Sequence, residues 1–199
     1  LNGDGAGGNG ALRSSSGNNT FAGNITLASN SRIQSDTAGD LLLIDAASGD
    51  AISGTNVNVT FAGEGDITVA DAIALGTGSL TKDGEGILTL NGNNTYTGTT
   101  TVSNGILVMN GNNSAATGDV TIGTNAILGG EGTIGGNTSV FGSISTGSNP
   151  DAFDIGTLNF NGKNLTFEDN SSWFVDLVQD TNGFSDLINN VGTFTIGAN

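Results

Sequence analysis

Two segments of this chain repeat one another at a spacing of 19 residues. Residues 86–98 read GILTLNGNNTYTG, and residues 105–118 read GILVMNGNNSAATG. A related segment, GNNTFAG, occupies residues 17–23, and its separation from the copy at Gly92 is close to four whole periods. A period near twenty residues, built of short β-type runs separated by Gly and Asn, is typical of a solenoid whose units must stack to bury a core. The repeat therefore predicts an all-β parallel β-helix, with about 19 residues per rung and roughly ten rungs in the 199 residues.

Short apolar or alternating runs occur throughout the chain, and most of them end at Gly, Asn, Asp or Ser. This arrangement indicates strands separated by turns, and no segment shows helical periodicity over more than a dozen residues. The expected strands lie at residues 25–27, 41–44, 57–61, 67–69, 87–90, 106–109, 120–122, 158–160, 165–167 and 194–196. Residues 172–178 alternate in the same way and also fit a strand.

Alignment of the two copies stacks large aliphatic residues on each other. The pairs are Ile87 and Ile106, Leu88 and Leu107, and Leu90 and Met109, which we expect to form an inward-facing ladder. Corners of a solenoid need positive φ or close backbone approach, which Gly and Asn supply at least cost. The Gly-Asn-Asn groups at residues 17–19, 92–94 and 111–113 are therefore expected at corners, where stacked Asn side chains can hydrogen-bond along the column.

The balance of charge excludes several classes of partner. Four basic residues stand against 19 acidic ones, for a formal net charge of −15. Such a surface repels a phosphate backbone and anionic lipid, so nucleic acid is not expected as a partner. No apolar run reaches eighteen residues, so the sequence predicts no membrane-spanning helix and no direct insertion by this segment.

Catalysis is not expected from this composition. The chain has no Cys and no His, which leaves carboxylates, hydroxyls and Tyr96 for acid–base or nucleophilic chemistry. Carboxylates could pair across rungs, as in polysaccharide-cleaving β-helices, at Asp36, Asp40 and Asp45 or at Asp151 and Asp154. Against this, only Arg13, Arg32, Lys82 and Lys163 could assist them. We predict no enzyme activity, no cofactor and no metal site.

Three further features have simple structural interpretations. The Gly-rich residues 3–10 lack a following helix and a repeated Asp register, so a turn is expected rather than a phosphate or calcium loop. Thr95, Thr97 and residues 99–101 resemble the threonine arrays of ice-binding solenoids, but the pattern is not sustained from turn to turn in the sequence, so an ordinary strand surface is expected. Trp173, Phe174 and Phe184 are expected in the core of the last rungs.

Residues 80–102 and 105–108, LTKDGEGILTLNGNNTYTGTTTV and GILV, resemble the autotransporter-associated β-strand repeat, also called the passenger-associated transport repeat. The family pattern runs Leu-Thr-Lys, Gly-x-Gly-x-Leu-x-Leu, Asn-x-Tyr-x-Gly and a closing Gly-x-Leu. The matching positions are Lys82, Gly84, Gly86, Leu88, Leu90, Asn94, Tyr96, Gly98, Gly105 and Leu107, and Met109 extends the ladder.

The likeness is strongest over residues 79–109 and weaker elsewhere. Residues 10–27 resemble a degenerate repeat, and residues 156–199 resemble the C-terminal coils of a passenger. The resemblance implies a right-handed parallel β-helix exported through the outer membrane of a Gram-negative bacterium. Residues 1–199 are expected to form a single β-helix segment of a longer passenger, whose neighbours are flanking passenger coils and a translocating barrel in the parent chain.

These observations lead us to expect a non-catalytic stalk or spacer at the bacterial cell surface, which aids secretion-coupled folding and presents adhesive regions. An alternative is a subunit that associates with itself into an extracellular fibre or surface layer. A third is a β-helix that binds or cleaves polysaccharide. Tyr96 aligns with Phe21 and Ala115 in the three copies, so it is expected to fill a packing slot rather than to supply a functional hydroxyl.

Overall fold

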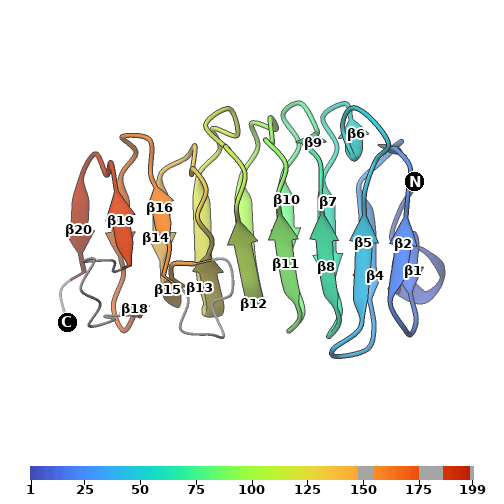
Figure 1. Cartoon of the computed structure of the whole chain (residues 1–199), viewed down its shortest axis with the longest axis horizontal. Helices are drawn as coiled ribbons and strands as arrows, with labels where there is room; N and C mark the ends of the chain where they lie inside the picture. Colours follow the sequence, from blue (N-terminus) through green and yellow to red (C-terminus); the bar gives the residue numbers. More distant parts are fainter. Residues whose placement is uncertain (148–154, 175–185, 198–199) are drawn as a thin grey trace.

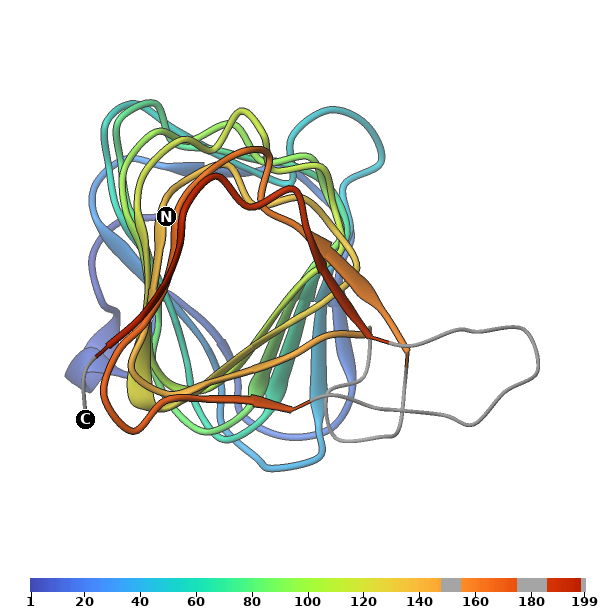
Figure 2. The ribbon, with the colours of Figure 1, turned by 90° about the vertical axis from the view of Figure 1, so that its left-hand side faces the viewer.

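Short strands with alternating buried and exposed residues stack on one another in parallel along the chain. In β4 (Ser31–Ser35) every second side chain is buried, and in β11 (Ile87–Leu90) Leu88 and Leu90 are buried. A computed structural model, which describes residues 1–147, 155–174 and 186–197, forms an all-β parallel solenoid (Figure 1). Figure 2, viewed along the coil, shows the chain winding turn after turn around one interior. The expected fold class is confirmed.

Three faces surround this interior. The first face contains β1 (Leu12–Ser14), β4, β7 (Val59–Ala62), β10 (Leu80–Lys82), the start of β12 (Thr100–Met109), the start of β13 (Val120–Gly129), β14 (Thr138–Val140), β17 (Leu165–Phe167) and β20 (Phe194–Ile196). These nine stacked strands are close to the expected ten rungs.

The second face follows after a corner and contains β2 (Asn19–Phe21), β5 (Leu41–Ile44), β8 (Asp66–Val69), β11, the later parts of β12 and β13, β15 (Ser143–Ser145) and β18 (Ser172–Phe174). The third face contains β3 (Ile25–Leu27), β6 (Ile52–Gly54), β9 (Ile73–Ala74), β16 (Thr157–Asn159) and β19 (Leu187–Asn189). Before β1, a 3₁₀ turn, η1, covers Ala6–Gly8.

Rung length varies far more than the regular repeat predicts. Leu88 pairs with Leu107, one repeat period further on, as expected. Among the paired strands, the shortest step joins Ile127 to Ser143, and the step from Thr157 to Leu187 is almost twice as long. The expected uniform rung is therefore wrong, because parallel pairing fixes the strand register while the corners between strands absorb different numbers of residues.

This variation displaces the first copy of the repeat. Phe21 stacks on Ile44, which in turn stacks on Val69 and then Leu90, so Phe21 belongs to the Leu90 column and not to that of Tyr96. Residues 17–19 likewise lead into β2 rather than stacking with residues 92–94. The alignment of Phe21 with Tyr96 is wrong for this reason. Phe21 is also 38% exposed at the N-terminal end of the solenoid.

The apolar interior continues from rung to rung. One column on the first face runs through Ile33, Phe61, Lys82, Val102, Ile122, Val140 and Phe167, and all seven side chains are buried. Near the C-terminal end the aromatic residues behave differently. Trp173 is 39% and Phe174 57% exposed, so the expectation that they lie in the core is wrong, and Phe184 lies outside the described residues.

An outward column of hydroxyl groups follows the same face. It comprises Thr60, Thr81, Thr101, Thr121, Ser139, Thr166 and Thr195, each paired with the next through the strand register. We refer to it as the hydroxyl column. The sequence predicts that the threonine pattern of residues 99–101 is not sustained over successive turns. In the strand register the position of Thr101 does continue with hydroxyl residues, whereas Thr100 stacks on Leu80 and Val120. Unequal rung lengths scatter these residues along the sequence although they align in space.

Candidate functional site

The repeat segment forms the middle of the solenoid, where β10, β11 and β12 stack. Leu88 lies between Ile67 and Leu107, and Leu90 lies between Val69 and Met109. All four matched ladder residues, Leu88, Leu90, Leu107 and Met109, are at most 2% exposed. The register of this ladder is as the sequence predicts. Ile87 and Ile106 also pair, but Ile87 is only half-buried, because strand alternation turns this position outward.

Asparagine side chains join consecutive rungs at the corner that follows β11 and β12. Asn94 is 1% exposed, and its Oδ1 accepts a hydrogen bond from the Ile73 amide at 2.8 Å. Its Nδ2 donates to Asn113 Oδ1 at 2.6 Å, while Asn113 Nδ2 donates to the Gly111 carbonyl. The expected asparagine ladder therefore exists at residues 92–94 and 111–113. Each buried amide satisfies backbone groups that the corner would otherwise leave unpaired.

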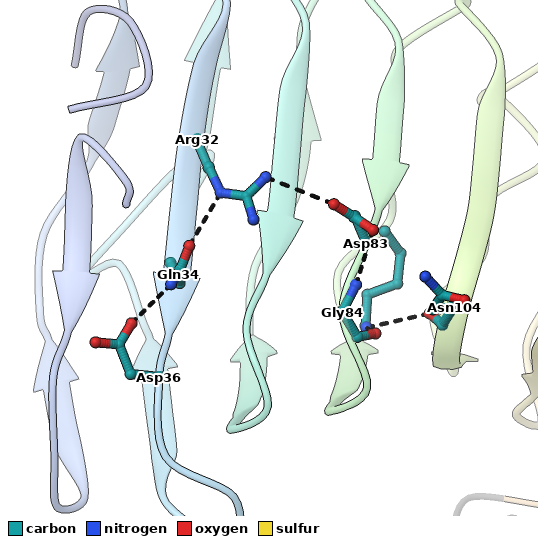
Figure 3. Close-up of polar contacts among 7 residues, drawn as sticks. Arg32, Gln34, Asp36, Asp83, Gly84 and Asn104 are labelled. Atoms are coloured by element: carbon teal, nitrogen blue, oxygen red, sulfur yellow. Dashed lines mark hydrogen bonds and ion pairs between the residues drawn. The ribbon is translucent and has the colours of Figure 1, made fainter. Parts of the chain in front are cut away.

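Lys82 is the least expected member of the repeat, because it occupies the inward column of the first face. It pairs with Phe61 on one side and Val102 on the other, and it is 3% exposed. Its Nζ donates to the Gly84 carbonyl at 2.5 Å and to the Asn104 carbonyl at 3.3 Å, so it joins the corners of two consecutive rungs. Figure 3 shows Gly84 and Asn104 near the surface residues Arg32 and Asp83.

Burial changes the chemistry of the Lys82 ammonium. Removal from water lowers the pKa of Lys82 from 10.5 to about 8, although the nearby carboxylates of Asp83 and Asp66 act in the opposite direction. The alternation of residues in β10 indicates that Lys82 faces inward. Leu80 and Lys82 are two residues apart in a strand and must face the same side, and Leu80 is fully buried.

Tyr96 fills the interior at the third face and is fully buried. Its hydroxyl forms a 2.7 Å hydrogen bond with Thr100 Oγ1, which is also buried. Burial raises the pKa of Tyr96 to about 12, with a smaller opposing effect from Thr100. The packing role is as expected, but the view that the hydroxyl does little needs correction, since it is the partner of a buried polar group. Ala115 is exposed, so it does not occupy the corresponding slot.

The repeat glycines allow close approach at two corners. Gly84 and Gly105 have φ of +92° and +70°, a region that side chains rarely adopt. Gly98 lies in a different column, where a Cβ atom would clash with the Gly78 carbonyl oxygen. Gly86 lies beside the Gly65 backbone in the corner that Gly84 begins. These positions need glycine for backbone conformation or space, which agrees with a structural role.

Polar residues also form a chain on the outer side of the first face (Figure 3). Arg32 Nη1 lies 3.6 Å from Asp83 Oδ2, and Arg32 Nε donates to Gln34 Oε1 at 3.0 Å. Gln34 Nε2 donates to Asp36 Oδ1, and the Arg13 guanidinium holds the pKa of Asp36 below its usual value. The sequence does not predict this chain of contacts, because its members lie on three different rungs, those of β1, β4 and β10.

Within the described part of the chain, the candidate carboxylates Asp36 and Asp40 have different partners. Asp36 bonds to Arg13 and Gln34, whereas Asp40 accepts a hydrogen bond from the Gly17 amide. Asp151 and Asp154 lie outside the described residues. Among the residues that the structure describes, no three acidic side chains are grouped as metal ligands would be. In the same part of the chain, no helix has the length and apolar character needed to cross a membrane.

The fold defines the chain as a parallel β-solenoid. Residues 80–109 match the family described as passenger-associated-transport-repeat, and these residues are the rungs from β10 to the end of β12. The chain therefore contains an autotransporter passenger repeat, which implies a secreted or surface-exposed bacterial protein. Comparison of the chain with curated proteins and with solved structures gives no match.

Proposed function

We propose that this chain is a non-catalytic rigid spacer in a passenger exported by a Gram-negative bacterium, and that it holds neighbouring adhesive regions away from the cell surface. The observation that carries the proposal is the unbroken stacking of nine strands on the first face, with the passenger repeat in its middle. Nine rungs about 4.8 Å apart span roughly 40 Å, a length set by backbone hydrogen bonds.

The same stacking supports a role in secretion-coupled folding. Each finished rung presents unpaired backbone groups to the next segment, so folding begun at one end can propagate as the chain emerges. The Asn94–Asn113 and Lys82–Asn104 hydrogen bonds both join consecutive rungs, so each can form only after the next rung has been added. Flanking passenger coils and a translocating barrel in the parent chain are the proposed partners.

Removal of one whole rung tests the spacer function. Deletion of residues 88–106 joins Ile87 to Leu107 and keeps every column in register. With spin labels on cysteines introduced at the exposed positions Asp50 and Asn161, we expect the interlabel distance to fall by about 4.8 Å. The chain has no cysteine of its own, so labelling is specific. Deletion of residues 88–97 breaks the register and serves as the control that fails to fold.

A display experiment tests the biological role. The chain is placed between a surface anchor and an epitope, and it is compared with a Gly/Ser linker of equal residue number, which behaves as a flexible coil. We expect the solenoid to hold the epitope at a fixed height and to keep it accessible to antibody. Equal height and accessibility with the linker would contradict the spacer function.

A further inference from the structure

One polar residue stands immediately before each strand of the first face, from β4 to β20. In chain order these residues are Asn30, Asn58, Ser79, Thr99, Asp119, Asn137, Asn164 and Thr193, and we refer to them as the register column. The first amide of each strand donates to the backbone carbonyl of the column residue one rung later, as the Ser31 amide does to Asn58 at 3.0 Å. The column therefore marks the point at which every rung re-enters the sheet.

Side chains of the register column add a second bond between rungs. In five of the seven steps along the column, a side-chain oxygen accepts the backbone amide of the next column residue. The acceptors are Asn30, Asn58, Ser79, Asn137 and Asn164, at distances of 2.8 to 3.1 Å. Because the donor is a backbone amide, this bond forms only when one particular residue of the later rung lies opposite the acceptor.

The lengths of the steps show where these bonds are needed. Consecutive column residues are 18 to 29 residues apart, although each step rises by one rung. The three longest steps, of 28, 27 and 29 residues, begin at asparagines, namely Asn30, Asn137 and Asn164. The step that begins at Ser79 has 20 residues and uses the shorter hydroxyl side chain. A long corner lets the chain re-enter the sheet at more than one residue, so asparagines stand where the corner alone specifies the register least.

The segment around β7 illustrates this ambiguity. Val57, Val59 and Phe61 alternate with polar residues, so the strand pattern continues two residues before β7 begins. The structure pairs Val59 with Ser31 and Phe61 with Ile33. A slip of two residues keeps the same side chains inward and would pair Val57 with Ser31 and Val59 with Ile33. Inward alternation alone therefore does not distinguish the two registers.

Asn30 distinguishes them. Its Oδ1 accepts the Asn58 amide at 2.8 Å, while the Ser31 amide donates to the Asn58 carbonyl, so both backbone groups of Asn58 are bound. After the slip, Asn56 would stand opposite Asn30. Asn56 has a φ of +57°, which belongs to a corner and not to a strand, and its amide donates to the Leu75 carbonyl at 2.9 Å.

We propose that the register column selects the residue at which each rung re-enters the first face, and that its asparagines prevent slips where the corners are longest. The column thus explains how a solenoid with unequal corners keeps one register. This inference goes beyond the spacer function, because a solenoid of any function needs a fixed register.

Disulfide formation between introduced cysteines measures the register, since the chain has no cysteine of its own. Thr60 pairs with Arg32 in the observed register and would pair with Gln34 after the slip. In the observed register the Cα atoms of Gln34 and Thr60 are about 8 Å apart, from a strand spacing of about 4.8 Å and a rise of about 3.3 Å per residue. Cysteines whose Cα atoms are more than about 7 Å apart cannot be bridged without backbone movement.

The measurement is a ratio of two rates under slow oxidation. The rate for the Gln34→Cys/Thr60→Cys pair is divided by the rate for the Arg32→Cys/Thr60→Cys pair, and the ratio reports the slipped fraction. Asn30→Ala removes the acceptor and should raise the ratio about two- to tenfold, the value of one hydrogen bond. Asn30→Asp keeps an acceptor oxygen and should leave the ratio unchanged.

The matched control is Asn93→Ala. Asn93 Oδ1 accepts the Asn112 amide at 2.8 Å outside the register column, so this variant loses an equivalent bond and should leave the ratio unchanged. Asn30 and Asn93 are both exposed, or partly so, on corners, and circular dichroism should show that all the variants are folded.

Three outcomes would overturn the proposal. If Asn30→Ala leaves the ratio unchanged, the bond adds stability and does not select the register, even when the variant unfolds more easily. If Asn30→Ala and Asn93→Ala raise the ratio equally, slipping follows a general loss of stability. If Asn30→Asp raises the ratio as much as Asn30→Ala does, the acceptor oxygen is not the group that selects the register.

Discussion

The buried Lys82 ammonium should make the stability of this solenoid rise with pH above neutrality. Its pKa is about 8 in the folded chain and 10.5 as the ordinary value. The folded state therefore binds this proton less tightly than the unfolded state does. The charged form of Lys82 therefore lowers the free energy of unfolding. This penalty is absent above pH 10.5 and grows as the pH falls toward 8. Below pH 8 the full penalty is about 3 kcal/mol, from about 1.4 kcal/mol for each pKa unit.

Between pH 7 and pH 9 this linkage predicts a gain of about 1 kcal/mol in the free energy of unfolding. The interval avoids Tyr96, whose pKa is raised to about 12 from 10.0, so that its ionisation opposes folding only above about pH 10. Lys82→Met keeps an unbranched apolar stem without the charge and should abolish the gain. Lys163→Met is the matched control, since Lys163 is only half-buried, and it should retain the gain.

Denaturant unfolding at the two pH values measures the difference, followed by circular dichroism and by the fluorescence of Trp173, the one tryptophan. Coincident curves from the two probes establish that the rungs unfold together. Equal stability of the wild type at pH 7 and pH 9 would refute the reasoning, as would a gain that survives in Lys82→Met.

Other substitutions and conditions give equally definite expectations. Leu88→Asp buries an unpaired charge in the ladder and should lower the free energy of unfolding by several kcal/mol, so an unchanged denaturation midpoint would show that Leu88 does not face inward. Tyr96→Phe leaves Thr100 Oγ1 without its hydrogen-bond partner and should cost about 1–3 kcal/mol in chemical denaturation. Tyr96→Ala leaves a cavity and should cost about 3–5 kcal/mol, and the opposite ranking would contradict the packing. Gly98→Ala places a Cβ against the Gly78 backbone and should lower the melting temperature, whereas Gly17→Ala, in open space with positive φ, should cost less. Melting curves with chelator and with millimolar calcium should coincide, and a large upward shift with calcium would reveal a metal site.

The fold class and the central register can be predicted from the sequence because two consecutive rungs in the middle of the solenoid have corners of nearly equal length. Between Leu88 and Leu107 the corners match in length, so stacked positions repeat visibly. Elsewhere the corners differ, and sequence spacing loses the register. For this reason alignment of the repeats puts Phe21 in the wrong column, and the hydroxyl column cannot be recognised from Thr60, Thr81 and Thr101 alone.

The buried polar groups of the repeat are harder to predict. A lysine is almost never fully buried without a partner, so Lys82 would ordinarily be placed on the surface. Only the alternation with Leu80 points inward, and only the structure shows the carbonyl groups of Gly84 and Asn104 that satisfy its ammonium. The Tyr96–Thr100 hydrogen bond likewise depends on how the chain turns between the third face and the first.

Because the corners differ in length, the rise of the solenoid per rung does not depend on the number of residues in the rung. Strand pairing sets the pitch of the column, while the length of a corner is free, as the short step from Ile127 to Ser143 and the long step from Thr157 to Leu187 show. Lengthening a loop costs only about 0.6 kcal/mol for each doubling of its length. A foreign peptide could thus be grafted at the exposed corner of residues 47–50 without changing the height of any rung. A peptide can therefore be attached at a chosen height along the solenoid.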